Sequence, residues 1–100
     1  MDATDAVIDQ AVLAGADMLL THHPLIFSPQ NRITAEDFTG KRIIKLIAND
    51  ICCYASHTNF DVMGMGDEAA ERLALEERSV LEITFEDELS QEGIGRVGIL

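Results

Sequence analysis

The sequence predicts an α/β fold in which helices flank a mostly parallel sheet. Two observations predict this class: helical segments alternate with short strand-like segments, and the first two of those strand-like segments are almost entirely apolar. Apolar runs without alternation are typical of strands covered on both faces, as in a parallel sheet. Alternating helices and strands also imply right-handed crossovers and three layers. With 100 residues, we expect a single α/β domain over residues 1–100.

The first predicted elements are a helix over residues 4–14 and a strand over residues 17–21. Asp2 or Thr4 can cap the start of this helix, and Gly15 ends it. The helix is amphipathic because its apolar residues recur with helical spacing: Val7, Ile8, Ala11 and Val12. The strand is nearly all apolar, so we expect it to be covered on both faces.

The next pair is a helix over residues 41–49 and a buried strand over residues 51–55. A loop that extends to Gly40 precedes the helix, with one turn opened by a capping box at residues 34–37. The helix repeats the amphipathic pattern with these residues inward: Ile43, Ile44, Ile47 and Ala48.

In the last part of the chain we expect a loop, a helix and two strands. The loop lies around Gly64 and Gly66, and Asp67 caps the helix that follows it. Residues 79–85 alternate apolar and polar side chains as a half-buried strand does, and residues 96–100 form another strand. Because the chain enters on a helix and stops on a strand, we expect it to be a fragment of a longer protein.

The composition excludes several classes of protein. With seven Lys and Arg and a net charge of −11, the chain has no basic stripe for a phosphate backbone, so we expect no nucleic-acid partner. Its apolar runs are too short to span a membrane, and no secretory signal opens it. Adjacent Cys52 and Cys53 do not have zinc-site spacing and are interpreted as reduced, buried small hydrophobes. We therefore expect a cytoplasmic protein.

All three histidines come directly after predicted strands, where open α/β sheets place their ligand sites. His22 and His23 follow the first strand, and Pro24 restricts His23 to an extended conformation. Imidazole suits zinc, iron, nickel and copper, while a carboxylate can bridge two cations. The sequence therefore predicts a divalent-metal site made of His22, His23 and Asp61. His57, past the second strand, can be a further ligand, a group that supports a ligand, or a proton donor beside a substrate.

The histidines and one glycine segment each have a second interpretation. A single histidine is more often an ordinary hydrogen-bonded residue, but the histidine pair together with the segment 57–61 favours a metal site. Residues 93–98 fit the letters of the dinucleotide-binding glycine pattern, G-x-G-x-x-G, but lead into a strand where that pattern must open a helix. We interpret them as a turn whose glycines permit positive φ.

Two segments resemble the signature blocks of a known family. The segment from Asp17, with HHPL at residues 22–25, and the segment from Tyr54, with HTNFD at residues 57–61, are similar to blocks of the NIF-three-like family. Members of this family are also called GTP cyclohydrolase 1 type 2 homologues. Residues 93–98 resemble a glycine–arginine block further along those proteins, so the resemblance spans nearly all of the chain.

The resemblance implies an incomplete NIF-three-like α/β fold, as part of a larger two-lobed protein. It also implies a dinuclear site that holds two divalent ions, zinc, iron, manganese or magnesium, in each full-length subunit. In that site His22, His23 and Asp61 are ligands, Asp61 bridges, and His57 lies beside them. The family completes the site with a His and a Glu near its C-terminus, and this chain has no histidine after His57. Residues 63–67 also depart from the family's usual sequence after the aspartate.

The function that these features favour is a metal-dependent hydrolase of small, nucleotide-like substrates, similar to GTP cyclohydrolase 1 type 2 homologues. Two cations would activate a shared water, and His57 is the expected catalytic residue, which orients the substrate or transfers a proton. The alternative is a non-catalytic metal-binding scaffold or a regulatory interaction protein. By resemblance we expect a homo-oligomer, a ring-shaped hexamer, with a small molecule as substrate and no membrane partner. We expect this fragment alone to be inactive.

Overall fold

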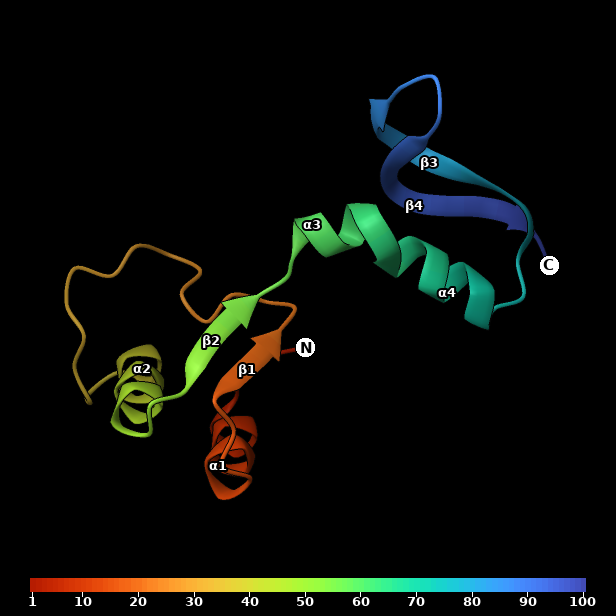
Figure 1. Ribbon diagram of the computed structural model, residues 1–100. Helices are drawn as coiled ribbons and strands as arrows, with labels where there is room; N and C mark the ends of the chain where they lie inside the picture. The colour runs from red at the N-terminus through yellow and green to blue at the C-terminus, as the bar shows by residue number, and fades with distance from the viewer. The chain divides into compact units, whose positions relative to one another are not determined.

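The computed structural model describes residues 1–100, which form two compact units, residues 1–57 and residues 58–100 (Figure 1). Each unit contains its own two-stranded sheet together with helices. The α/β class predicted from the sequence is confirmed, and the single domain over residues 1–100 stays a prediction. None of the helices has the length and apolar character needed to cross a membrane.

The first unit is a helix followed by a β-α-β segment. Its elements are α1 (Asp5–Leu13), β1 (Met18–Thr21), α2 (Phe38–Ala48) and β2 (Cys52–Ala55). The strands β1 and β2 pair in parallel, with Met18 opposite Cys52 and Thr21 opposite Ala55. The two helices, the two strands and their parallel pairing are therefore confirmed for this unit.

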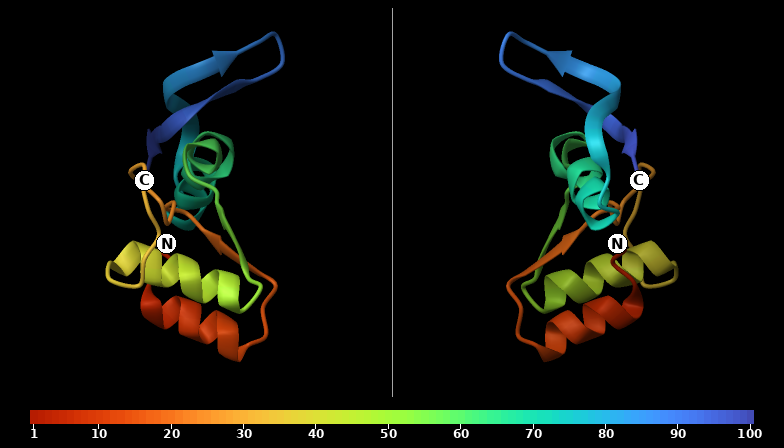
Figure 2. Two further views of the ribbon diagram at one scale, coloured as in Figure 1. Left: turned by 90° about the vertical axis from the view of Figure 1, so that its left-hand side faces the viewer. Right: turned by 90° about the vertical axis from the view of Figure 1, so that its right-hand side faces the viewer.

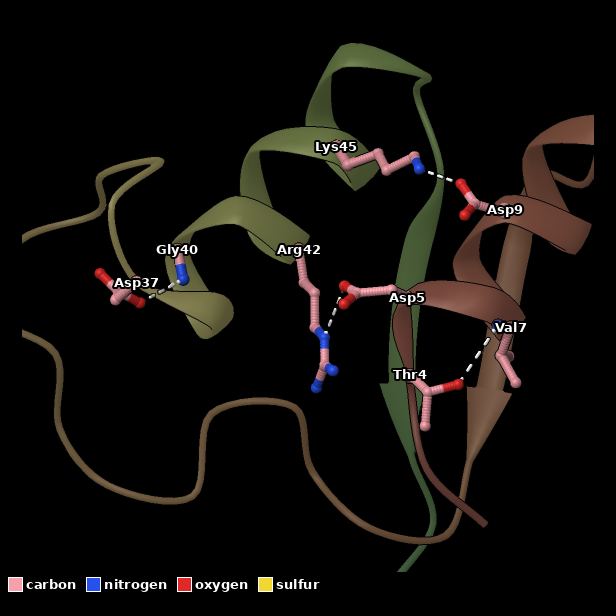
Figure 3. A network of polar contacts seen from close by, with 8 residues as sticks. All are labelled: Thr4, Asp5, Val7, Asp9, Asp37, Gly40, Arg42 and Lys45. Atoms are coloured by element: carbon pink, nitrogen blue, oxygen red, sulfur yellow. Dashed lines mark hydrogen bonds and ion pairs between the residues drawn. The ribbon is translucent and has the colours of Figure 1, made fainter.

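The start of α1 agrees with the sequence, whereas α2 begins at Phe38 rather than at residue 41. The hydroxyl of Thr4 caps α1 by accepting from the Val7 amide at 3.3 Å. The cap of α2 is Asp37, whose carboxylate accepts from the amide of Gly40 at 2.7 Å (Figure 3). Glycine at position 40 was interpreted as a loop residue, but it lies in the first turn of the helix. It is needed there because a Cβ atom would lie 2.1 Å from a backbone oxygen of the preceding loop.

The two helices α1 and α2 lie side by side on one face of the β1–β2 sheet, as Figure 2 shows. Two ion pairs join them: Arg42 Nε donates to Asp5 at 2.9 Å, and the Lys45 ammonium contacts Asp9 (Figure 3). Beneath these pairs is a small core in which Ile8 is fully buried. The core consists of Ala3, Ile8, Leu46 and Ile51, with Leu19 and Leu25 packed against it.

The other face of the β1–β2 sheet is exposed. Leu20 and Tyr54 retain 66% and 52% of their accessible surface, and Met18 lies with them. The predictions that both strands are covered on both faces and that Cys52 and Cys53 are buried are therefore wrong for this chain, where both thiols are exposed. For Met18, Leu20, Cys52 and Tyr54 the physical reason is that both helices pack on the same face, so no layer covers the other. Cys53 lies on the helix side, where it lines a cavity with Ile43 and Leu46.

The second unit begins with one continuous helical run. It consists of α3 (Thr58–Phe60), the π-helical turn η1 (Asp61–Met65) and α4 (Gly66–Arg72). The loop predicted around Gly64 and Gly66 is therefore wrong. Glycine costs a helix only about 1 kcal/mol, so packing can retain it in a helical turn. Gly64 lies against the ring of Phe60, where an added Cβ would approach a ring carbon to 3.0 Å.

The two remaining strands, β3 (Glu76–Glu86) and β4 (Gln91–Ile99), form an antiparallel hairpin. They do not extend the parallel sheet, so the mostly parallel arrangement holds only for the first unit. The connection between them is too short for parallel pairing, which needs a crossover of about a dozen residues or more. The carboxylate of Asp87 organises the turn by accepting from the amides of Leu89 and Ser90, each at 2.8 Å. The segment 93–98, interpreted as a turn, lies within β4, so the turn is wrong; the positive φ expected of its glycines is found at Gly95, with a value of 74°.

A buried guanidinium connects the hairpin to the helical run of the second unit. Arg96 donates through Nε and Nη2 to the two carboxylate oxygens of Asp67 at 2.6 and 2.8 Å. Its Nη1 also donates to the carbonyls of Gly93 and Gly95. The Arg96 side chain is only 8% exposed. These contacts hold the pKa of Asp67 below its usual value, because the guanidinium hydrogen-bonds the ionised carboxylate. Asp67, predicted as a helix cap, thus binds Arg96.

Candidate metal centre

The three histidine rings gather at the carboxyl-terminal end of the β1–β2 sheet. His22 and His23 follow β1 directly, and His57 follows β2 after one intervening residue. Because Thr21 and Ala55 are opposite each other in the parallel register, the two strands end level. The ring centroid of His22 lies 4.9 Å from that of His23 and 4.6 Å from that of His57. The structure therefore brings together all three histidines that the sequence placed after strands.

The donor atoms of this cluster fit a divalent cation. Each ring offers one nitrogen, and the three nitrogens lie within 4.8 Å of one another. Two nitrogens that bind one tetrahedral zinc ion are about 3.4 Å apart, because each Zn–N bond is about 2.1 Å. Nitrogens within 4.8 Å of one another therefore have to approach by at most about 1.4 Å to share an ion. His22 and His57 are half-buried and His23 is exposed, so the cluster is open to an ion from one side.

The backbone of the histidine pair is held by residues from the start of the chain. The carbonyl of Met1 accepts from the amides of both His22 and His23, at 3.0 and 3.1 Å. On the other side, the hydroxyl of Thr21 donates to the carbonyl of His23 at 2.8 Å. The buried side chain of Thr21, the last residue of β1, thus links the strand to the histidine pair that follows it. Hydrogen bonds on both sides therefore hold His23, which Pro24 was expected to restrict to an extended conformation.

The carboxylate of Asp2 is a site residue that sequence reasoning missed. Its Oδ1 lies 2.6 Å from Nδ1 of His23. This hydrogen bond is the largest cause that holds the pKa of Asp2 below its ordinary value. From the sequence, Asp2 was considered only as a cap for the first helix, a position that Thr4 occupies instead. The only available signal was an acidic residue near the start of the chain, which does not specify a partner.

Asp61, the third ligand predicted from the sequence, belongs to the second unit. It is the first residue of η1 and is half-buried. The cluster that the structure assembles consists of His22, His23 and His57, and the part of Asp61 as a ligand stays a prediction. His57 lies close enough to His22 to share an ion with it, which keeps open both the ligand role and the catalytic role.

A cavity of about 310 Å³ borders the histidine cluster within the first unit. Asp2 and His23 lie at one side of it, and Arg42 lines it with its side chain over the Phe38 ring, 5.3 Å from the centroid. Its lining also includes Leu25, Phe27, Ser28 and Gln30. The cavity therefore offers a cationic group, aromatic rings and hydrogen-bonding side chains beside the imidazoles.

Comparisons with known proteins give one consistent result. The family model for Duf34/NIF3 (NGG1p interacting factor 3) matches residues 1–100. The chain is 40% identical over 99 residues to the GTP cyclohydrolase 1 type 2 homolog of Clostridium perfringens, covering 97% of this chain and 37% of that protein. It is 39% identical over 93 residues to the homolog of Bacillus subtilis, covering 91% of this chain and 25% of that protein. The chain thus spans about a quarter to two fifths of these relatives' length.

Solved structures agree with these sequence matches. The crystal structure of a Bacillus cereus protein related to NIF3 superimposes with a TM-score of 0.80 and 45% identity, covering 85% of this chain and 24% of that chain. Reduced HcgD from Methanocaldococcus jannaschii superimposes with a TM-score of 0.72 and 37% identity, covering 82% of this chain and 33% of that chain.

Proposed function

Because this chain belongs to the Duf34/NIF3 family, we propose that it contributes His22 and His23 to a divalent-metal centre that hydrolyses a small, nucleotide-like substrate. The observation that carries the proposal is the cluster of three imidazoles whose donor nitrogens lie within 4.8 Å of one another. Three neutral imidazole donors in one corner suit zinc or iron.

Each residue of the cluster has its own proposed role. His22 and His23 would hold an ion, and Asp61 is the proposed carboxylate ligand in the full-length subunit. When bound, a divalent ion would lower the pKa of water and polarise the bond under attack. His57 orients the substrate or transfers a proton through a ring nitrogen, because imidazole changes its charge near neutral pH.

The cavity beside the cluster supports a small substrate with a planar ring. Phe27 and Phe38 provide aromatic surface in its lining, and Arg42, which also pairs with Asp5, provides a guanidinium opposite the carboxylate of Asp2. The relatives are named GTP cyclohydrolase 1 type 2 homologs, which agrees with a nucleotide-like compound.

The test is a turnover assay with the full-length protein loaded with zinc, manganese or iron. A panel of nucleotides and phosphoesters is offered, and the metal content is measured by elemental analysis in the same samples. We expect turnover that a chelator abolishes and that falls at least about a hundredfold in His22→Ala. The matched control is Gln10→Ala, since Gln10 is exposed on α1 and does not line the cavity. Full metal content without turnover of any compound would contradict the hydrolase.

A second candidate is a non-catalytic metal-binding scaffold or a regulatory interaction protein. It is favoured by the family description, which names an interacting factor, and by the exposed apolar face of the β1–β2 sheet. We also propose a homo-oligomer, the ring-shaped hexamer that the family resemblance implies. Sedimentation of the full-length protein at several concentrations tests it, and a monomer throughout would contradict it.

A further inference from the structure

The side chain of His23 has a carboxylate partner at hydrogen-bond distance. Asp2 Oδ1 lies 2.6 Å from His23 Nδ1, and the two residues are distant in the sequence. Met1, the residue before Asp2, holds the histidine backbone, since its carbonyl accepts from the amides of His22 and His23. Ring and backbone of His23 are therefore positioned by one short segment.

The contact with Asp2 determines which ring nitrogen of His23 carries the proton. An ionised carboxylate can only accept hydrogen bonds, so Nδ1 of a neutral His23 must carry the hydrogen. The lone pair is then on Nε2, the nitrogen at the other side of the ring. A metal ion binds an imidazole through such a lone pair, and ligating histidines commonly donate their other N–H to a carboxylate.

We propose that Asp2 is a positioning residue that fixes the Nδ1–H tautomer of His23 and so presents Nε2 to a divalent cation. This inference rests on the proposed metal centre. Asp2 does not bind the ion, because its carboxylate is engaged with the far side of the ring. It acts through His23, by removing the alternative tautomer and restricting rotation of the ring.

Two structural roles for Asp2 are already filled by other residues. Thr4 caps α1, so Asp2 is not needed for the start of that helix. Asp5 makes the ion pair with Arg42 that joins α1 to α2. The side chains of Asp2 and His23 are 58% and 47% exposed, and exposed ion pairs contribute little to folding. Replacing Asp2 should therefore leave the fold intact and change the tautomer of His23 and its affinity for metal.

The experiment measures tautomer and zinc affinity separately in the chain and its Asp2→Asn and Asp2→Ala variants. Long-range ¹H–¹⁵N spectra of labelled histidine, recorded without metal above the usual imidazole pKa, report which nitrogen of each ring is protonated. A His23→Gln variant assigns the signals. Calorimetry with zinc alone gives the affinity. Asp5→Asn is the matched control, because it removes a neighbouring exposed carboxylate that does not contact His23.

In the unaltered chain and in Asp5→Asn we expect His23 as the Nδ1–H tautomer. Both Asp2 variants should shift His23 toward Nε2–H and weaken zinc binding about 10- to 100-fold, the usual effect of losing such a partner. An unchanged His23 tautomer in both Asp2 variants would overturn the inference, as would unchanged zinc affinity in a chain that binds zinc. A shifted tautomer in a chain that never binds zinc would support the tautomer control. Zinc binding is then repeated with the full-length protein, where a lack of zinc would refute the metal centre, so the two failures are distinguishable.

Discussion

The imidazole rings of His22 and His57 lie with their centroids 4.6 Å apart and their planes tilted by 31°. They come from the ends of two different strands, and the parallel register of β1 and β2 is what places them together. An antiparallel pairing would have placed the ends of these strands at opposite edges of the sheet. The parallel register of β1 and β2 thus brings two histidines that are distant in the sequence close enough to serve one site.

Replacing His22 tests whether the imidazole cluster binds metal as a unit. His22→Ala removes the ring that lies nearest to both other histidines, so we expect zinc affinity to fall by about two orders of magnitude or more. Tyr54→Phe is the control, because this exposed residue of β2 lies outside the cluster. Calorimetry with zinc measures the affinity of both variants. An affinity of His22→Ala equal to that of Tyr54→Phe would contradict a site built on His22.

Replacing Asp61 tests the carboxylate that the sequence assigned as a bridging ligand. In the full-length protein, Asp61→Ala should lower the metal content from two ions per subunit toward one or none, since a bridging carboxylate belongs to both coordination shells. Elemental analysis against protein concentration measures this content. Glu71→Gln, an exposed acidic residue of α4, should retain full metal. Full content in Asp61→Ala would exclude the ligand role.

Replacing Arg96 should destabilise the second unit. Arg96→Ala removes the two hydrogen bonds to Asp67 and leaves the carbonyls of Gly93 and Gly95 without this donor. We expect the free energy of unfolding to fall by about 1–3 kcal/mol, the usual cost of losing buried hydrogen-bond partners. Urea denaturation followed by circular dichroism measures the change. Arg72→Ala is the control, because its 77% exposed side chain pairs only with Glu68, and a similar loss there would argue against a special role of Arg96.

The same pair predicts a pH dependence. The pKa of Asp67 is lowered in the folded chain by Arg96, so the ionised carboxylate stabilises the fold at pH values above its usual pKa of 3.8. This stabilisation is lost as the pH falls below that value and through the lowered folded pKa, because protonation removes the acceptor. The unfolding midpoints of the chain and of Asp67→Asn should therefore differ at neutral pH and converge in acid. A constant difference down to strongly acidic pH would contradict this explanation.

Two glycines should respond differently to replacement by alanine. At Gly40 the new methyl group would lie 2.1 Å from the carbonyl oxygen of Thr34, so the loop must move, at a cost of about 3 kcal/mol. At Gly15 nothing lies within 4 Å, and the cost comes only from its φ of 62°, about 1–2 kcal/mol. Thermal unfolding of both variants measures the order. A less stable Gly15→Ala would show that the 34–40 contact is easily relaxed.

Local pattern predicted most of the elements but missed two helical turns that contain glycine. The helical spacing around Ile8 and the apolar run of residues 17–21 predicted α1 and β1 because burial of one face imposes a period on the sequence. The helical turn at Gly64 and the first turn of α2 at Gly40 were interpreted as loop. Each glycine lies close to another group, the ring of Phe60 for Gly64 and the backbone of Thr34 for Gly40, and residue type alone does not reveal such a packing contact.

For the candidate site, the sequence by itself determined that His22, His23 and His57 follow strands and that the strands suit a parallel sheet. That was enough to predict that the three rings meet, because parallel strands end at one edge. Only the tertiary structure decided that Asp2 contacts His23. A hydrogen bond between two residues far apart in the sequence depends on the path of the intervening helix and strand, and neither residue type nor spacing records that path.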